Sequence, residues 1–531
     1  MIRFTKTASG ALFALSLCTA AAYGQTATLD APPAGITPAA VSLAQVRALH
    51  QRAVAGHLPG SYRLHETLKA EGIQGTLDRI EHGGDYRVDE MLGPVHTAEG
   101  IYHGRRWQQN GTGEVATISG VHQRTQIDDA VEATLGAGAT LLGEVTDPVH
   151  AYVVRIDPPG GRLEYVFYDT VSGHIDRIEA IRAGSREITT YDQYAAVGAA
   201  TIPWHEHTVD SRTSEERDLR IVTADTSSTV SDGEVAPPAP VDPLAVSSWP
   251  SVMPAQFLSD RVILRTRING HPVDLQLDSG SSGVLIDKSV LDASGIRTFG
   301  KGNAVTAGLY AVEEAVVPRI EIGNAALTNV AVEAAPFSEI ADNHTVVAGL
   351  LGFDLIDTAV VKIDYASAEL SLLDPATFTA PPNAVSVPIA LDDLVPAIAA
   401  TIAGASASHM VVDTGADRST LFSQFIRANP ERTKDQGLGE RERDAYPFEQ
   451  QFYGVGGQVS FSQLQLGPLA VAGVTFPTWL FDATENAASF EFEDIDGLIG
   501  QDVLRYFDVY LDYPQQRIYF VPNQRYRDRF S

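Results

Sequence analysis

The stretch from Val273 to Leu285, VDLQLDSGSSGVL, decides how the rest of the chain is interpreted. An apolar strand runs into Asp278-Ser279-Gly280, and a second apolar run follows. A carboxylate at the end of a buried strand is costly unless it is paired or used, because ionisation away from water is penalised. The pattern returns at Met410–Phe422, MVVDTGADRSTLF, where Asp413-Thr414-Gly415 follows another apolar strand. We therefore expect a duplicated half-site in which the two carboxylates meet.

The segments around each aspartate recur in the same order. A strand ending in a turn precedes each site, VILRTRING (262–270) in the first half and PAIAATIAG (396–404) in the second. Downstream of the first site come Leu350-Leu351-Gly352 and the strand VVKIDY, and downstream of the second come Leu498-Ile499-Gly500 and DVYLDY. This recurrence indicates an internal duplication at the scale of a domain.

The doubled pattern, hydrophobic-Asp-Ser/Thr-Gly followed by hydrophobic-hydrophobic-Gly, resembles the pepsin/retropepsin aspartic proteases over residues 258–523. The resemblance implies a mainly β fold with a pair of double-ψ barrels, one lobe at 255–380 and the other at 381–525. It also implies that Asp278 and Asp413 form a catalytic dyad that shares one proton and activates a water to hydrolyse a polypeptide substrate, without cofactor or metal.

The residues around each aspartate have expected supporting roles. Gly280 and Gly415 permit the tight turn that brings two backbones together, and Ser279 and Thr414 hydrogen-bond across to the opposite loop in that family. The two apolar-Gly segments are expected to pass behind the aspartate loops and hold them rigidly. Ser281 offers a hydroxyl beside the first carboxylate whereas Ala416 stands in its place in the second half, so we expect an asymmetric site.

Flap hairpins are expected after each aspartate loop. The candidates are 306–317, with Gly308 and Tyr310, and the glycines Gly454, Gly456 and Gly457 in the second half. Tyr310 is a candidate for the flap tyrosine of pepsin-like enzymes. We expect the other nearby acids, Asp354, Asp357, Asp364, Asp417 and Asp512, to be turn and surface residues.

The first 24 residues read as a secretory signal peptide, with Arg3 and Lys6 before an apolar run. The single cysteine, Cys18, lies within it, so the exported chain has no disulfide and suits a bacterial periplasm or exterior. Lipidation at Cys18 with attachment to the outer membrane is the alternative, although Leu17 is bulky for a lipidation motif. The net charge of −29 disfavours nucleic acid as a partner.

Residues 42–224 alternate apolar and polar residues between glycine-rich turns, which predicts a curved antiparallel sheet. Helices are expected near 41–55 and 128–142. The pattern from EGIYHGRRW to DRIEA resembles the periplasmic lipoprotein-localisation chaperones, which implies an apolar or lipid ligand. Scaffold and removable pro-segment are the alternatives. Residues 225–254, rich in Ser and Pro, are expected to be a linker.

Two hypotheses follow for the whole chain. The first is an exported, monomeric aspartic endopeptidase that uses Asp278 and Asp413. The second is a periplasmic protein that binds a lipid or peptide and retains a vestigial protease fold. A metal is not expected, because His205 and His207 lie two residues apart without an evident third ligand.

Overall fold

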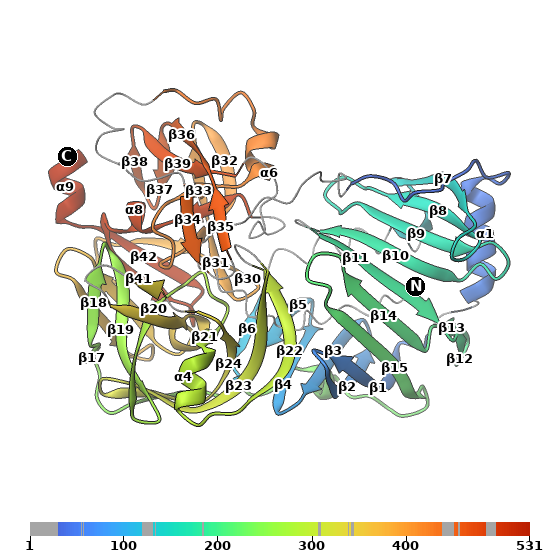
Figure 1. Cartoon of the computed structure of the whole chain (residues 1–531), viewed down its shortest axis with the longest axis horizontal. Coiled ribbons are helices and arrows are strands. Elements are labelled where there is room, and N and C mark those ends of the chain that lie inside the picture. Colours follow the sequence, from blue (N-terminus) through green and yellow to red (C-terminus); the bar gives the residue numbers. More distant parts are fainter. Residues whose placement is uncertain are drawn as a thin grey trace.

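The computed structural model describes residues 30–530 apart from 55, 57, 119–130, 133, 183–184, 306–308, 338, 341–344, 438–450, 455–456 and 485–494. The expected signal peptide with Cys18 therefore lies outside the described residues, as do Gly308 and Gly456. Figure 1 shows an N-terminal sheet domain on one side and two stacked β lobes on the other. The fold is mainly β, as the sequence predicted. None of the described helices is long and apolar enough to cross a membrane.

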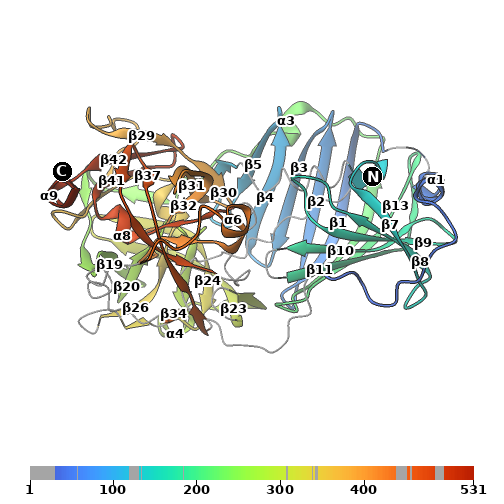
Figure 2. The same ribbon diagram turned by 90° about the horizontal axis from the view of Figure 1, so that it is seen from above.

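The N-terminal domain is built on one 13-stranded antiparallel sheet, in the order β6-β5-β4-β3-β2-β1-β15-β14-β11-β10-β9-β8-β7. Figure 2 shows its strands from above, with helix α1 at the far end from the lobes. Its first strands are β1 (Ser61–Ala70), β2 (Ile73–His82), β3 (Asp85–Leu92), β4 (Val95–Tyr102), β5 (Arg105–Gln109) and β6 (Val115–Thr117). The later strands are β7 (Ala139–Val145), β8 (Ala151–Ile156), β9 (Glu164–Asp169), β10 (Ile175–Arg182), β11 (Ser185–Asp192), β14 (His205–Asp210) and β15 (Glu216–Asp225).

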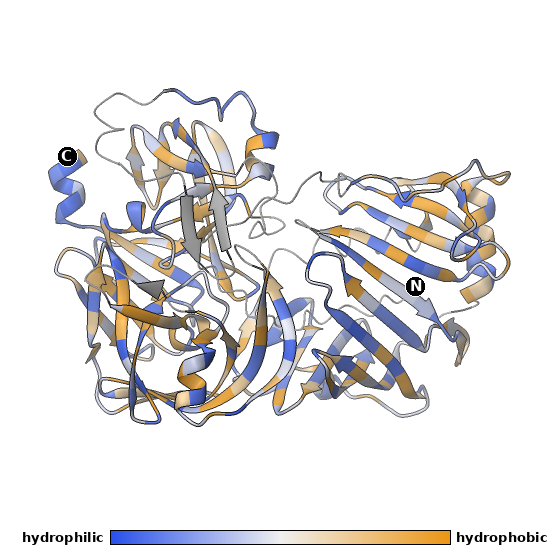
Figure 3. Cartoon of the chain, in the orientation of Figure 1, coloured by the Kyte–Doolittle hydropathy of each residue, from blue (hydrophilic) through white to orange (hydrophobic). Residues whose placement is uncertain are grey.

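Apolar packing covers this sheet in several separate clusters, two of which lie beneath other elements. Helix α1 (Leu43–Val54) buries Val46 against Val154, Val166 and other residues of β8–β10. The hairpin of β12 (Ala195–Val197) and β13 (Ala200–Ile202) covers Tyr62 and neighbours on β1 and β15. Strands β14 and β15 are largely hydrophilic in Figure 3, whereas β8–β10 are banded with hydrophobic residues. The sheet therefore has apolar packing at separate places rather than one continuous core.

Charged pairs occupy part of the same sheet. Arg217 bonds Glu90 at 2.6 Å, and Arg106 pairs with Glu99 at 3.5 Å. Glu90 and Glu99 are both buried. Buried charges are tolerated where they are paired, so these pairs make this part of the sheet polar inside.

The segment expected to be a linker is tied to its neighbours. It contains α3 (Asp232–Val235), β16 (Leu244–Val246) and β17 (Ser251–Val252). Strand β16 pairs with β24 of the first lobe, and β17 pairs with β28. Its chain is thus fixed by main-chain hydrogen bonds at its C-terminal end.

Lobe 1 contains a ten-stranded sheet whose main path runs β16-β24-β21-β26-β20-β19-β23-β22. Strand β20 pairs with β26 in parallel, while β21 pairs antiparallel with β26 and parallel with β24. The elements are β18 (Ala255–Leu258), β19 (Arg261–Ile268), β20 (His271–Leu277), β21 (Val284–Asp287), α4 (Lys288–Ala293), β22 (Thr298–Val305), β23 (Leu309–Ile322), β24 (Ala325–Ala335), β25 (Glu339–Ile340), β26 (Val346–Leu351) and α5 (Phe353–Ile356).

Lobe 2 repeats this arrangement. Strand β32 pairs with β40 in parallel, and β33 pairs antiparallel with β40 and parallel with β39. The elements are β30 (Ala390–Asp392), β31 (Val395–Ile402), β32 (Ala405–Val412), β33 (Thr420–Leu421), α6 (Ser423–Ala428), β34 (Gln451–Gly454), β35 (Gly457–Ser460), β36 (Ser462–Leu466), β37 (Leu469–Val471), β38 (Val474–Phe476), β39 (Trp479–Ala483), β40 (Gly497–Ile499) and α8 (Gln501–Leu504). The matching pairings confirm the two-lobed β fold.

A six-stranded sheet joins the lobes, in the order β17-β28-β27-β41-β42-β29. Strand β27 of the first half pairs antiparallel with β41 of the second, with Ile363 opposite Val509. Its elements, with the C-terminal helix, are β27 (Val360–Asp364), β28 (Glu369–Leu373), β29 (Val385–Pro388), β41 (Phe507–Asp512), β42 (Arg517–Pro522) and α9 (Gln524–Phe530). One apolar core runs from lobe 1 through this sheet into lobe 2, so the two halves pack as one body.

Candidate active site

The two aspartates occupy equivalent places at the ends of β20 and β32. The backbone N–H of Asp278 donates to Leu351 O at 3.0 Å, and that of Asp413 donates to Ile499 O at 3.0 Å. Both side chains are 0% exposed. The parallel pairing of β20 with β26, and of β32 with β40, therefore fixes the position of the aspartate at the end of each strand.

The glycines bring each loop against the opposite carboxyl. A Cβ atom added at Gly280 would lie 2.7 Å from Asp413 Cγ, and one added at Gly415 would come even closer to Asp278 Cγ. Real Cβ atoms do not approach other atoms this closely, so only glycine fits at either position. The structure thus brings Asp278 and Asp413 together.

Backbone donors hold one oxygen of each carboxylate. Asp278 Oδ1 accepts from Gly280 N at 2.9 Å, and Asp413 Oδ1 accepts from Gly415 N at 2.7 Å and Ala416 N at 3.0 Å. The Oδ2 atoms of both aspartates have no hydrogen-bond partner within the described part of the chain. Each carboxyl is therefore fixed through one oxygen while the other remains available to a reactant.

Reciprocal hydrogen bonds between Ser279 and Thr414 join the two loops. Ser279 N donates to Thr414 Oγ1 at 2.9 Å, and Thr414 N donates to Ser279 Oγ at 3.0 Å. Each hydroxyl also donates to the opposite strand, Ser279 to Val412 O at 2.7 Å and Thr414 to Leu277 O at 3.1 Å. All of these groups are buried, so the four bonds fix the separation of the loops.

The apolar-Gly segments lie directly behind the aspartate loops. Leu350 and Leu351 are paired with the last residues of β20, and Leu498 and Ile499 with those of β32. A Cβ at Gly352 would lie 2.7 Å from Gly283 O, and one at Gly500 would lie 2.6 Å from Arg418 C. These segments are therefore packed against the loops with no room for a side chain at either glycine.

Ser281 and Ala416 occupy equivalent positions after the two aspartates and differ in the hydroxyl of Ser281. Its hydroxyl donates to Gly283 O at 3.0 Å, and no described bond joins it to Asp278. The hydroxyl is thus bonded within its own turn, and its expected role beside the Asp278 carboxylate stays a prediction. In the second half Ala416 contributes its backbone N–H to Asp413.

Two glutamines that the sequence reasoning missed bind the loop of Asp413. Gln276 Nε2 donates to Gly415 O at 2.9 Å, and Gln501 donates to Thr414 O. Both are buried. Both glutamines stand out in the sequence as polar residues in apolar surroundings. Gln276 lies inside the strand VDLQLD, and Gln501 directly follows GLIG. On the other side, the Tyr513 hydroxyl donates to Ser279 O at 3.4 Å.

Burial and mutual repulsion determine how the dyad ionises. Burial, and next the charge of Asp413, raise the pKa of Asp278 well above its ordinary value, against the donation of the Gly280 N–H. Burial also raises the pKa of Asp413, opposed by the N–H of Gly415 and by Asp278. Two acids in such contact do not ionise independently, because ionisation of one disfavours ionisation of the other.

The expected flaps are hairpins in both halves. In lobe 1, β22 pairs with β23 on either side of 306–308, and in lobe 2, β34 pairs with β35 with Gly454 opposite Gly457. Tyr310 is 7% exposed and packs with Ala304, Val312 and Leu350. It lies in a buried apolar cluster, and no described hydrogen bond connects it to either aspartate.

Other acids expected at the surface are buried. Asp354 is 1% exposed and Asp512 is 2% exposed. Asp354 faces the N-terminal domain, which the sequence pattern of lobe 1 alone does not reveal. That expectation is corrected for these two residues.

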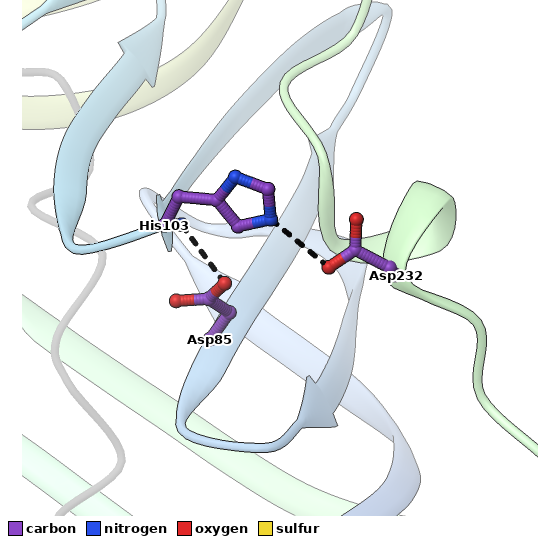
Figure 4. Close-up of side chains that lie close together, drawn as sticks. All are labelled: Asp85, His103 and Asp232. Atoms are coloured by element: carbon purple, nitrogen blue, oxygen red, sulfur yellow. Dashed lines mark hydrogen bonds and ion pairs between the residues drawn. The ribbon is translucent and has the colours of Figure 1, made fainter.

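Among the described residues, one group has the composition of a metal site, Asp85, His103 and Asp232 (Figure 4). His103 Nε2 lies 3.2 Å from Asp232 Oδ1, and its backbone N–H donates to Asp85 at 2.8 Å. The side chains of His103 and Asp232 are 64% and 56% exposed. His205 lies 2.9 Å from both Asp192 and Asp218. These histidines are thus engaged with acids of their own surroundings.

Comparison with known proteins found a family model and several solved structures to which parts of this chain are similar. The aspartyl protease family model matches residues 264–355, which include Asp278 and Leu350-Leu351-Gly352 but not Asp413. An aspartic proteinase from Irpex lacteus aligns over 52% of this chain and 98% of its own, with 13% identity and a TM-score of 0.33. A LolA superfamily protein from Nitrosomonas europaea aligns over 37% of this chain and 98% of its own, with 12% identity and a TM-score of 0.28. No curated protein matches the sequence of this chain.

Proposed function

We propose that this chain is an aspartic endopeptidase whose dyad is Asp278 and Asp413. The observation that carries the proposal is the contact of each aspartate with the glycine of the opposite loop, which only a paired site requires. The buried hydroxyl bonds between Ser279 and Thr414 support it, because they hold the carboxyls rigidly at the lobe interface.

The chemistry follows from one proton shared by two carboxyls. The ionised carboxylate acts as general base on a water between the free Oδ2 atoms, and that water attacks a peptide carbonyl. The protonated partner donates a hydrogen bond to the carbonyl oxygen as negative charge develops there. The proton taken from the water then passes to the leaving nitrogen, which completes hydrolysis without a metal.

The test is cleavage of a denatured, fluorescently labelled protein between pH 3 and 7. Asp278→Asn and Asp413→Asn should each lower kcat/KM at least about 1,000-fold, because each removes the acid–base pair. Asp274→Asn, on the same strand β20 but only half-buried, is the matched control and should retain activity. Cleavage by Asp278→Asn at the rate of the native chain would refute the proposal.

The second candidate is an apolar ligand bound by the N-terminal sheet. The apolar surfaces beneath α1 and the β12–β13 hairpin favour it, but the paired charges between them disfavour a long continuous acyl site. We therefore rank it below peptide hydrolysis. Solvent extraction of the purified protein followed by mass spectrometry tests it, and the absence of any co-purifying lipid would count against it.

We further propose that the chain is exported to a bacterial periplasm or exterior and acts as a monomer. The apolar N-terminal segment and the absence of cysteine after Cys18 support export. We propose the domain limits 42–224, 255–380 and 381–525, with 225–254 as the connecting segment. Sequencing the N-terminus of the exported protein tests cleavage near Gly24, and incubation at acid pH tests whether the first half is later removed.

A further inference from the structure

The N-terminal domain binds the outer edge of the β22–β23 hairpin. Strand β22 is the last strand on its side of the lobe 1 sheet, so its outward N–H groups have no neighbouring strand. Lys301 N donates instead to Glu71 O at 2.7 Å, in the turn between β1 and β2. Asn303 donates through its amide to Thr213 O at 3.1 Å and through its backbone to the Glu215 carboxylate. Figure 1 shows β22 on the side of lobe 1 that faces the sheet domain.

Carboxyl groups from both domains gather where this contact is made, with Glu333 buried and Glu71, Glu215 and Glu314 half-buried. Glu314 on β23 and Glu333 on β24 are directly opposite each other and so share a face. Glu333 is 0% exposed, and neither of its oxygens has a partner among the described residues. Glu71 and Glu215 approach from the N-terminal domain. We call Glu71, Glu215, Glu314 and Glu333 the flap-side acid cluster.

A second group of acids lies at the same interface. Glu114 of the N-terminal domain and Asp354 of α5 are 2% and 1% exposed. Asp354 Oδ1 accepts from the hydroxyl of Thr112 and lies 3.4 Å from Asn110 Nδ2. Asp357 is one turn further along. We call Glu114, Asp354 and Asp357 the helix-side acid cluster.

Three cations lie near the flap-side acid cluster among the described residues: Arg217, Arg212 in the turn that contacts Asn303, and Lys301 on β22. The cation that acts on Glu71 is Arg217, which is already bonded to Glu90 at 2.6 Å. Other titratable groups that influence the two clusters are Glu90, Asp210, Glu216, Tyr310 and Asp242. Like charges from two domains are costly to bring together out of water, so protonation of these acids favours the closed arrangement.

We propose that the N-terminal domain is a proton-dependent clasp on the β22–β23 hairpin, closed at acid pH and progressively released as the pH rises toward neutrality. Its effect on proteolysis rests on the proposed function, because the hairpin is the expected flap of the site. The docking itself does not depend on catalysis. Closure at acid pH restrains the hairpin, and release frees its outer edge.

Linkage between proton binding and closure gives the direction of the pH dependence. Burial and neighbouring acids raise the pKa of Glu71 to about 7 and that of Asp357 to about 7, and burial raises the pKa of Asp354 to about 6. Separation of the domains would return the pKa values of these groups toward their ordinary values. At any pH between the ordinary pKa values and about 7, the closed form therefore binds more protons than the open form. The closed form is therefore most favoured at pH values below the ordinary pKa values of these acids. It becomes less favoured as the pH rises, and no further change is expected once the acids are ionised in both the closed and the open form.

Amide hydrogen exchange of the full chain tests the clasp directly. The Lys301 amide is protected by an acceptor across the interface, so its exchange reports opening of the clasp. After correction for intrinsic exchange, its protection should fall at least about tenfold between pH 5 and pH 8, since one unit of pKa shift is worth about tenfold. The Ile363 amide, in the sheet between the lobes, should not follow it.

Variants separate this proposal from its alternatives. The double variant Glu314→Gln, Glu333→Gln should keep Lys301 protected at pH 8. Glu321→Gln, at a half-exposed position on β23 with Glu314, should behave as the native chain. Asp278→Asn should show the native pH dependence even if it is inactive, so failure of the clasp and failure of the proposed function are distinguishable. An unchanged protection of native Lys301 across the range would overturn the proposal. So would protection at pH 8 restored by calcium chloride, which would indicate a cation in place of protons.

Discussion

The dyad and the flap-side acid cluster both bury carboxyl groups that face one another, but the backbone treats them differently. Asp413 accepts hydrogen bonds from Gly415 N and Ala416 N, whereas neither oxygen of Glu333 has a partner among the described residues. Donors stabilise a carboxylate, and burial without donors stabilises the neutral acid. Burial alone therefore does not make a catalytic acid. The dyad retains one usable charge because its loops supply N–H groups.

The largest loss of activity is expected from a substitution at Gly415, where the Asp278 carboxyl leaves no space for a side chain. Gly415→Ala would place a methyl group on the Asp278 carboxyl, which lies too close for any Cβ. We expect kcat/KM to fall at least about 1,000-fold, because the reacting groups are displaced. Gly437→Ala serves as a partial control, since a Cβ there meets nothing within 4 Å, although its φ of +80° adds some strain. Full activity of Gly415→Ala would contradict the paired geometry.

The next effect concerns the bonds between the loops. Thr414→Val removes a hydroxyl that accepts from Ser279 N and donates to Leu277 O, leaving both groups buried and unsatisfied. The free energy of unfolding should fall by about 2–4 kcal/mol, measured by urea denaturation. Thr401→Val, at an exposed position of β31, should change it by less than about 0.5 kcal/mol. Equal effects of the two substitutions would show that the loops are not joined as described.

A smaller effect, opposite in sign, is expected at the interface. The pKa of Asp354 is raised to about 6 from 3.8, so the folded protein loses stability as the pH rises through that window. Asp354→Asn cannot ionise, and we expect it to be more stable than the native chain by about 1–3 kcal/mol at pH 8 and nearly equal at pH 3.5.

The matched substitution is Asp364→Asn. The N–H and hydroxyl of Ser367 and the charge of Lys362 lower the pKa of Asp364 against the cost of its burial, so its ionised form contributes stability above its ordinary value. Its replacement should therefore destabilise the protein at pH 8, a change opposite to that of Asp354→Asn. Chemical denaturation at both pH values measures each. Destabilisation by both substitutions at pH 8 would mean that the interface acids are stabilised as charges.

The smallest effect is expected at Tyr513. Its hydroxyl makes a long bond of 3.4 Å to Ser279 O. Tyr513→Phe should lower the free energy of unfolding by less than about 1 kcal/mol and change kcat less than about threefold. Gln276→Leu removes a shorter bond to Gly415 O and should cost more on both measures. A larger loss of stability and activity for Tyr513→Phe than for Gln276→Leu would contradict the view that Gln276 supports its loop more strongly than Tyr513 does.

The sequence predicts the dyad well because its constraints are local and repeated. Asp278 and Asp413 each stand between an apolar strand and a glycine, and each is followed by an apolar pair ending in glycine. The helix expected near 128–142 was wrong at its C-terminal end, because strand β7 begins at Ala139. Gly138 has a φ of 97°, which interrupts a helix and favours the turn before that strand.

Contacts between domains could not be predicted from the same patterns. Glu314 and Glu333 look like the polar face of an antiparallel hairpin, and nothing in their neighbourhood in the sequence signals a second domain above them. Ser281 illustrates a related limit, because the sequence pattern does not indicate that its hydroxyl donates to Gly283 O within the turn. Tertiary contact, rather than local propensity, determines these outcomes.

The sheet shared by β27 and β41 has a mechanical consequence. Its strands run side by side and antiparallel, with Val361 opposite Leu511 and Ile363 opposite Val509, so sliding one lobe along the other loads several backbone bonds at once. The sheet between the lobes therefore resists sliding of one lobe along the other more than it resists bending between them. Relative motion of the two lobes is therefore expected to be a bend across this sheet rather than a slide along it.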